Sequence, residues 1–159
     1  MSKAPSGDSP VHLRLPYLGL ALIGGTLGTA AREAITLAFP STSGIPWAIF
    51  AVNVLGAFLL GVLLDALARM GPDEGRRRRL RILIGTGFTG GFTTYSALAT
   101  DTASLLGEGR VGIGYGLGTV LVGGIATWAG IAAAIALHGM HHATVTRRTV
   151  DAPQSGDSL

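Results

Sequence analysis

Four apolar stretches of the 159-residue sequence are each long enough to cross a lipid bilayer. They cover about residues 17–37, 47–67, 82–106 and 111–137. Hydrophobic residues make up 48% of the chain and charged residues only 13%, far from the balance of a soluble domain. Such stretches fold as helices, because a chain in hydrocarbon has to satisfy its own backbone hydrogen bonds. The sequence therefore predicts an all-α membrane protein with four transmembrane helices.

The third stretch is unlike an ordinary membrane helix, because four glycines fall between Gly85 and Gly91. Each interior glycine costs a helix about 1 kcal/mol relative to alanine. Non-helical backbone is tolerated at membrane depth only where protein or a water-filled cavity covers it, as at the ion sites of transporters. We expect the helix to be broken near residues 87–94. The alternative is that Gly85, Gly87 and Gly91 only allow close helix packing.

Polar tails flank the membrane domain, which we place at residues 15–138. Residues 1–14 are rich in Ser, Gly and Pro and lack the apolar core and cleavage site of a signal peptide, so we expect a disordered tail that is retained. Residues 139–159 form a polar C-terminal tail. The chain has no cysteine, which excludes disulfides and thiolate metal sites.

Three histidines close the fourth stretch: His138, His141 and His142. They could bind a metal ion. Because Arg147 and Arg148 follow them at a span end, a basic interfacial tail is the better interpretation.

Basic residues lie mainly on one side of the predicted membrane. With four spans, ten of the twelve Lys and Arg residues share the face of the two termini and of the charged loop from Met70 to Arg81. These ten are Lys3, Arg14, Arg69, Arg76, Arg77, Arg78, Arg79, Arg81, Arg147 and Arg148, and the other two are Arg32 and Arg110. The asymmetry predicts cytoplasmic termini in the inner (plasma) membrane.

The run Arg76-Arg77-Arg78-Arg79 could bind RNA or lipid headgroups. The arginines flank apolar spans, however, and no aromatic residues alternate with them. An orientation signal is therefore the better interpretation, and we expect no nucleic acid partner.

Two polar groups lie within or beside the first two spans. Asn53 is an amide at mid-span, which is costly without a partner, so it either bonds across helices or lines a polar pathway as a donor. Arg32 and Glu33 form either a snorkelling interfacial pair or, through Arg32, an electropositive vestibule for anions.

The fourth stretch carries a polar stripe. Tyr115, Thr119, Gly123 and Thr127 recur every four residues and so share one helix face. The Thr hydroxyls could bond back to carbonyls of their own helix. The other interpretation is a ladder of weak donors along a pore.

Three motifs together resemble the small bacterial fluoride channels of the CrcB or Fluc family, over roughly residues 15–138. They are Gly24-Gly25-x-x-Gly28-x-x-x-Arg32, Asn53-x-x-Gly56-x-Phe58-x-x-Gly61 and Gly87-Phe88-x-Gly90-Gly91-Phe92-Thr93-Thr94-Tyr95-Ser96. The third is the most specific.

The resemblance implies an antiparallel dimer that exports fluoride through two pores along the subunit interface. It also implies a structural Na⁺ where the two broken third helices cross, held by the backbone carbonyl oxygens of Gly90 and Thr93. Hard cations favour such oxygen ligands. By position, the implied ion pathway comprises Asn53, Tyr95, Ser96, Tyr115 and Thr119, with Arg32 at a vestibule.

The chain departs from the family pattern in the third and in the fourth span. The usual Thr-Thr-Phe-Ser-Thr-Phe ends here in Tyr95-Ser96-Ala97-Leu98, so one pore Phe is Tyr95 and the other is Leu98. A phenyl ring edge can face an anion, whereas Leu98 has no such edge. In the fourth span Gly123 replaces a hydroxyl.

These features predict a passive fluoride-selective channel that lowers fluoride toxicity, and no enzymatic activity. One alternative is a proton-coupled exporter, which would need a titratable group at mid-membrane; we expect none in the third or fourth span. The other is a non-conducting structural or accessory subunit of a heteromeric membrane complex, which Leu98 favours.

The charge asymmetry also bears on assembly. Antiparallel homodimers need a chain that inserts in both orientations, whereas this chain should insert in only one. We therefore expect an antiparallel heterodimer with a paralogous subunit of opposite charge bias, with a homodimer as the alternative.

Overall fold

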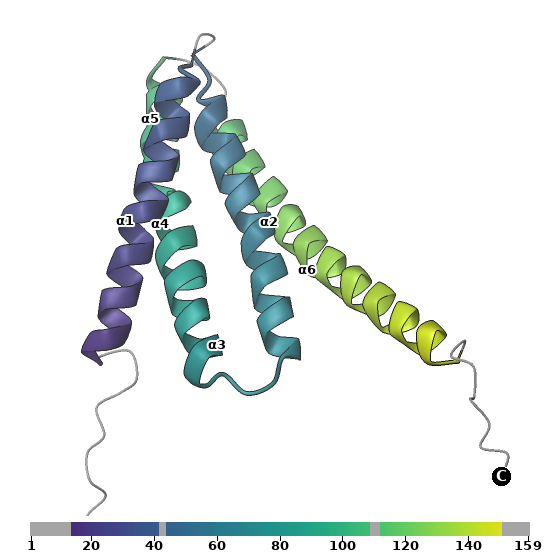
Figure 1. The fold of residues 1–159 in the computed structure, drawn as a ribbon. Helices are drawn as coiled ribbons and strands as arrows, with labels where there is room; N and C mark the ends of the chain where they lie inside the picture. Colours follow the sequence, from purple (N-terminus) through teal and green to yellow (C-terminus); the bar gives the residue numbers. More distant parts are fainter. Residues whose placement is uncertain (1–13, 42–43, 109–111, 151–159) are drawn as a thin grey trace, which may run out of the picture.

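The computed structural model describes residues 14–41, 44–108 and 112–150, and every regular element in these ranges is a helix. In chain order they are α1 (Leu15–Ala38), α2 (Trp47–Arg69), α3 (Gly75–Leu80), the π-helical segment η2 (Arg81–Phe88), α4 (Thr89–Phe92), α5 (Tyr95–Gly107) and α6 (Gly112–Val150). Figure 1 shows their arrangement. The all-α prediction is confirmed, and α1, α2, the α3–α5 series and α6 correspond to the four predicted spans.

Two boundaries differ from the predicted ones. The charged loop after α2 is shorter than predicted, because α3 already begins at Gly75, so the arginine run forms the first turns of the third helix. Arginine is a good helix former. The helix begins after its N-cap residue Glu74, whose backbone is extended. At the other end, α6 continues to Val150, into the segment predicted as a polar tail. The N-terminal tail prediction, apart from Arg14, falls outside the described residues.

The first and third helices approach each other through glycines. A Cβ atom added at Gly24 would overlap the Leu83 carbonyl oxygen, and one at Gly28 would overlap that of Phe88. From the other side, a Cβ at Gly91 would overlap the Gly25 carbonyl oxygen. Gly91 therefore serves close packing of η2 and α4 on α1, the alternative interpretation, and lies within α4.

The second and fourth helices form a similar pair. A Cβ at Gly61 would overlap the Thr127 carbonyl oxygen, and one at Gly130 that of Phe58. Contacts between α2 and α6 are the most extensive between any two helices. The bundle therefore consists of two closely packed helix pairs.

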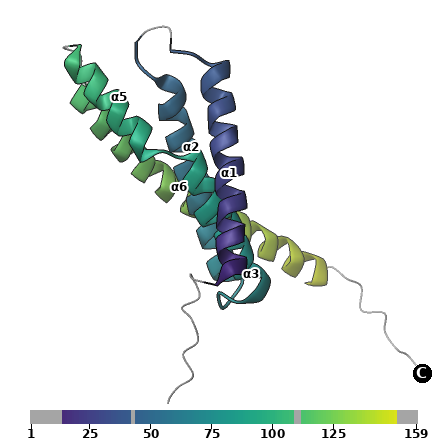
Figure 2. The ribbon, with the colours of Figure 1, turned by 90° about the vertical axis from the view of Figure 1, so that its left-hand side faces the viewer.

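The third helix passes from one pair to the other. Helical structure ends at Phe92 and resumes at Tyr95, and the two residues between are extended: Thr93 has φ −79° and ψ 156°, and Thr94 has φ −147° and ψ 120°. Before this point η2 and α4 pack on α1, and after it α5 packs on α6. Figure 2 shows α5 leaning away from α1. The interruption lets one span contact both pairs.

Much of the apolar surface faces outward. Leu22 is 71% exposed on α1 and Trp128 is 72% exposed on α6, whereas Val52 is only 2% exposed. By length and composition, Trp47–Arg69 and Gly112–Gly139 are long and apolar enough to cross a membrane. These surfaces are suited to lipid or to another subunit.

We expect Gly28→Ala to destabilise the protein by about 1–3 kcal/mol, because the added methyl group forces α1 away from α4. Gly19→Ala on the same helix is the matched control, since a Cβ there meets no atom within 4 Å and alanine favours the helix. Thermal unfolding in detergent measures both. Equal midpoints for the two variants would contradict the close packing.

Candidate functional site

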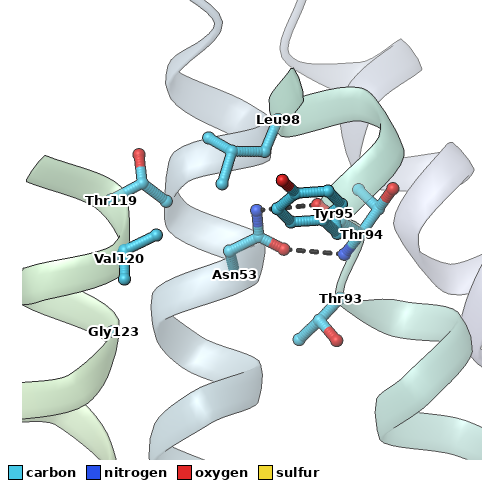
Figure 3. A pocket seen from close by; sticks show the side chains of 8 residues that line it. All are labelled: Asn53, Thr93, Thr94, Tyr95, Leu98, Thr119, Val120 and Gly123. Atoms are coloured by element: carbon cyan, nitrogen blue, oxygen red, sulfur yellow. Dashed lines mark hydrogen bonds between the residues drawn. The ribbon is translucent and has the colours of Figure 1, made fainter. Parts of the chain in front are cut away.

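A depression of about 190 Å³ lies beside the interruption of the third helix (Figure 3). Residues from α2, α6, α5 and the extended segment line it: Asn53, Thr93, Thr94, Tyr95, Leu98, Thr119, Val120 and Gly123. All of these side chains are uncharged, and five of them carry a hydroxyl or an amide. The surface thus offers weak donors without a fixed charge.

Asn53 holds the extended segment in place. Its Oδ1 accepts a hydrogen bond from the Thr94 N–H at 2.8 Å, and its Nδ2 donates to the Thr94 carbonyl oxygen at 3.2 Å (Figure 3). The Asn53 amide therefore gives both the N–H and the carbonyl oxygen of Thr94 a hydrogen-bond partner. Asn53 bonds across helices, which is the structural interpretation of this residue. An amide has a second N–H, so a role toward a ligand is compatible with this bonding.

The same bonds release backbone carbonyls. In a continuous helix the Gly90 carbonyl would accept from the Thr94 N–H, and the Thr93 carbonyl from the Ala97 N–H. Here the Thr94 N–H donates to Asn53, and the Ala97 N–H donates to the Thr94 Oγ1 at 3.1 Å. Gly90 and Thr93 thus lose their helical partners.

Hydroxyl groups stabilise both sides of the interruption. Thr94 is the N-cap of α5, and its Oγ1 also lies 3.1 Å from the Ser96 Oγ. On the other side the Thr93 N–H and Oγ1 both donate to the Thr89 carbonyl, at 2.9 and 2.8 Å. Ser96 therefore contacts the extended segment but does not line the depression.

The two aromatic positions of the family pattern have opposite environments. Tyr95 is 81% exposed, whereas Leu98 is 7% exposed. Both line the depression, together with the buried Thr119. In this single chain the Tyr95 ring is thus available to a partner or a ligand, and Leu98 contributes an apolar wall.

The stripe on α6 is satisfied by backbone carbonyls. The Thr119 hydroxyl donates to the Tyr115 carbonyl at 2.8 Å, and the Thr127 hydroxyl donates to the Gly123 carbonyl at 3.1 Å. The Tyr115 hydroxyl donates to the Pro46 carbonyl at 3.3 Å. The two Thr bonds match the back-bonding interpretation, whereas the Tyr115 bond joins α6 to the residue before α2. Thr119 and Gly123 line the depression, whereas Tyr115 and Thr127 do not.

Arg32 and Asp101 are half-buried charged residues that lie outside the depression. Arg32 on α1 is half-buried, and its Nε has no hydrogen-bond partner. Asp101 on α5 is also half-buried, with an unpartnered Oδ2. Asp101 contradicts the expectation that the third span holds no titratable group. Its position directly after the uncharged run Ile82 to Thr100 is the signal that could have identified it.

Carboxylate, thiolate and imidazole groups do not cluster as metal ligands in the part of the chain that the structure describes. His138 is exposed within α6, and the side chains of His141 and His142 fall outside that part. The donors near the interruption that could hold a cation are the backbone carbonyls of Gly90 and Thr93.

Comparison with known proteins identifies the family. Residues 19–131 match the family described as CrcB-like protein, Camphor Resistance (CrcB). The chain is 49% identical over 130 residues to "Fluoride-specific ion channel FluC 2" of Leifsonia xyli subsp. xyli, an alignment that covers 80% of this chain and 90% of the relative.

Two further relatives agree. "Fluoride-specific ion channel FluC 1" of Cutibacterium acnes is 47% identical over 124 residues, 76% of this chain and 87% of the relative. A protein of the same name from Streptomyces coelicolor is 37% identical over 128 residues, 79% of this chain and 80% of the relative. The chain is a membrane protein that belongs to the CrcB/Fluc family.

Proposed function

We propose that the protein is a passive fluoride-selective channel that exports fluoride from the cytoplasm and so lowers its toxicity. The observation that carries the proposal is the depression at the interrupted third helix, where uncharged donors gather in a relative of proteins named fluoride-specific ion channels. A channel of this kind performs no bond chemistry, so no enzymatic activity is proposed.

The membrane potential supplies the driving force. Fluoride enters acidified cells as the neutral acid and is trapped as the ion. A negative-inside potential favours exit of an anion by about 2.3 kcal/mol per 100 mV. A passive pathway therefore suffices, without a cytoplasmic energy source.

Selectivity would come from groups that replace hydration water in a narrow path. The second N–H of Asn53 and the ring edge of Tyr95 are donors of this kind. The Thr119 hydroxyl would have to turn from the Tyr115 carbonyl toward the ion. Ser96 and Tyr115 would extend the path beyond the depression, and Arg32 would attract anions at its mouth.

We propose a structural Na⁺ between two subunits, held by the Gly90 and Thr93 carbonyl oxygens of each. The donor set fits, because hard cations prefer oxygen ligands and these carbonyls have lost their helical N–H partners. A Cβ added at Gly90 would meet no atom within 4 Å of this chain, which leaves room for a second subunit. The ion would stabilise the crossing of two interrupted helices.

The working unit would be an antiparallel dimer in the inner membrane, with both termini cytoplasmic. The unequal distribution of basic residues favours a heterodimer with a paralogous subunit of opposite charge bias. Relatives with numbered names, such as FluC 1 and FluC 2, are consistent with paired paralogues. A homodimer is the alternative.

Two alternative functions have specific support. Leu98 in an aromatic position favours a non-conducting accessory subunit, and Asp101 supplies the titratable group that a proton-coupled exporter would need. Fluoride efflux from liposomes without a proton gradient, measured for the chain alone and then with a candidate partner subunit, separates both alternatives from a passive channel.

We expect Asn53→Asp to abolish fluoride efflux from liposomes that hold the chain together with its partner subunit, because it places a negative charge beside the anion path and opposes the Thr94 carbonyl. Thr26→Val is the control, since the Thr26 hydroxyl bonds to its own helix on the exposed face of α1. Size-exclusion chromatography verifies assembly of both variants. Undiminished flux in assembled Asn53→Asp would exclude this role.

We expect Gly90→Leu to remove the Na⁺-dependent increase in melting temperature while unfolding in Na⁺-free buffer stays unchanged. Thr93→Ser should keep the Na⁺ effect, because the ligand is a main-chain oxygen. Gly91→Ala is the contrasting variant: its Cβ overlaps the Gly25 carbonyl oxygen and should destabilise the chain with or without Na⁺. A normal Na⁺ effect in Gly90→Leu would argue against the site.

We expect the chain expressed alone to insert in one orientation and to conduct little fluoride, with conduction restored by the paralogous subunit. A topology reporter at the C-terminus and fluoride efflux from liposomes measure the two properties. Mixed orientation with full efflux from the single protein would exclude the heterodimer.

A further inference from the structure

A cavity of about 440 Å³ lies at the start of α1. It shares no lining residue with the depression at the interrupted helix. The start of α1 supplies Arg14, Pro16, Tyr17 and Leu20, and α3 supplies Arg79. Figure 1 shows the start of α1 and α3 at the same end of the bundle. The cavity therefore joins the first helix to the beginning of the third.

The lining is basic at one part and apolar at another. The guanidinium groups of Arg14 and Arg79 supply the positive charge of the lining. Asp73, which lies two residues before α3, is bound to Arg81 at 2.5 Å and lies 3.6 Å from Arg78. Within the described ranges no ion pair involves Arg79. Its charge is thus available to an anionic ligand.

We propose that this cavity binds the headgroup of an anionic phospholipid from the leaflet on the arginine-rich face. Because α1 is a membrane span that begins at Leu15, the cavity lies at headgroup depth. Arg14 and Arg79 bind the phosphate, since guanidinium groups match phosphate oxygens in a bidentate manner. Tyr17 and Leu20 contact the glycerol and the upper acyl chain.

Position and size distinguish this site from a diffuse basic surface. Basic pockets between transmembrane helices are typical sites for lipid headgroups, and the volume falls within the range of small-ligand sites. A bound lipid would link α1 to α3 and so stabilise the start of the third helix. The proposal does not depend on which ion the protein conducts.

Native mass spectrometry of the full-length protein in detergent, titrated with phosphatidylglycerol or phosphatidylcholine, tests the site. We expect one phosphatidylglycerol molecule to bind tightly to each chain and no phosphatidylcholine molecule to bind with comparable affinity. Arg79→Gln should weaken binding about fivefold, the effect of one arginine near an anionic surface. Arg79→Lys should weaken it less, and Arg14→Gln combined with Arg79→Gln should weaken it further.

Arg76→Gln is the matched control, because it removes one charge from the same run at a residue that does not line the cavity. Equal weakening in Arg76→Gln and Arg79→Gln would overturn the proposal in favour of diffuse attraction. Displacement of the lipid by inorganic phosphate would assign the cavity to a soluble anion instead. Equal binding of both lipids would also overturn it. Melting temperatures without lipid verify that each variant is folded.

Discussion

The interrupted third helix depends on one side chain, the amide of Asn53. It bonds to both the N–H and the carbonyl of Thr94, so the residue that leaves the helix keeps its backbone satisfied. An unpaired backbone group at membrane depth would cost several kcal/mol. The interruption in turn allows η2 and α4 to pack on α1 while α5 packs on α6. A single amide thereby supports the connection between two helix pairs.

Backbone contact, rather than side-chain interlocking, holds each pair. Gly24 and Gly28 allow α1 to approach the third helix, and Gly61 and Gly130 do the same between α2 and α6. Lipid tails are as apolar as leucine side chains, so close van der Waals contact has to supply the affinity between membrane helices. Many large apolar residues are left on the outside, although Val52, Phe92, Leu98 and Leu105 are buried.

The apolar composition and the length of the four stretches are sufficient to predict the spans, because length and charge decide what can cross a bilayer. Local composition was misleading at Gly91, since a glycine that weakens a helix and a glycine that admits a neighbour look alike until the neighbour is placed. The partner of Asn53 lies 41 residues away, a contact that no pattern in the second span indicates. The sequence predicts a loop for the arginine run, because the charge of the run masks its good helix propensity. Asp101 follows the uncharged run by one residue, so the run itself does not reveal a titratable group in the third span.

The carbonyls of Gly90 and Thr93 have a consequence for how such a protein exists in a membrane. Two carbonyl oxygens without helical partners are costly at membrane depth unless another group or water satisfies them. In the proposed dimer, folding and association would be one equilibrium, and the stability of the chain would depend on its density in the bilayer. A cell that makes too little of the protein would then hold unfolded or unassembled chains rather than weakly active ones, and the dose response would be steeper than linear.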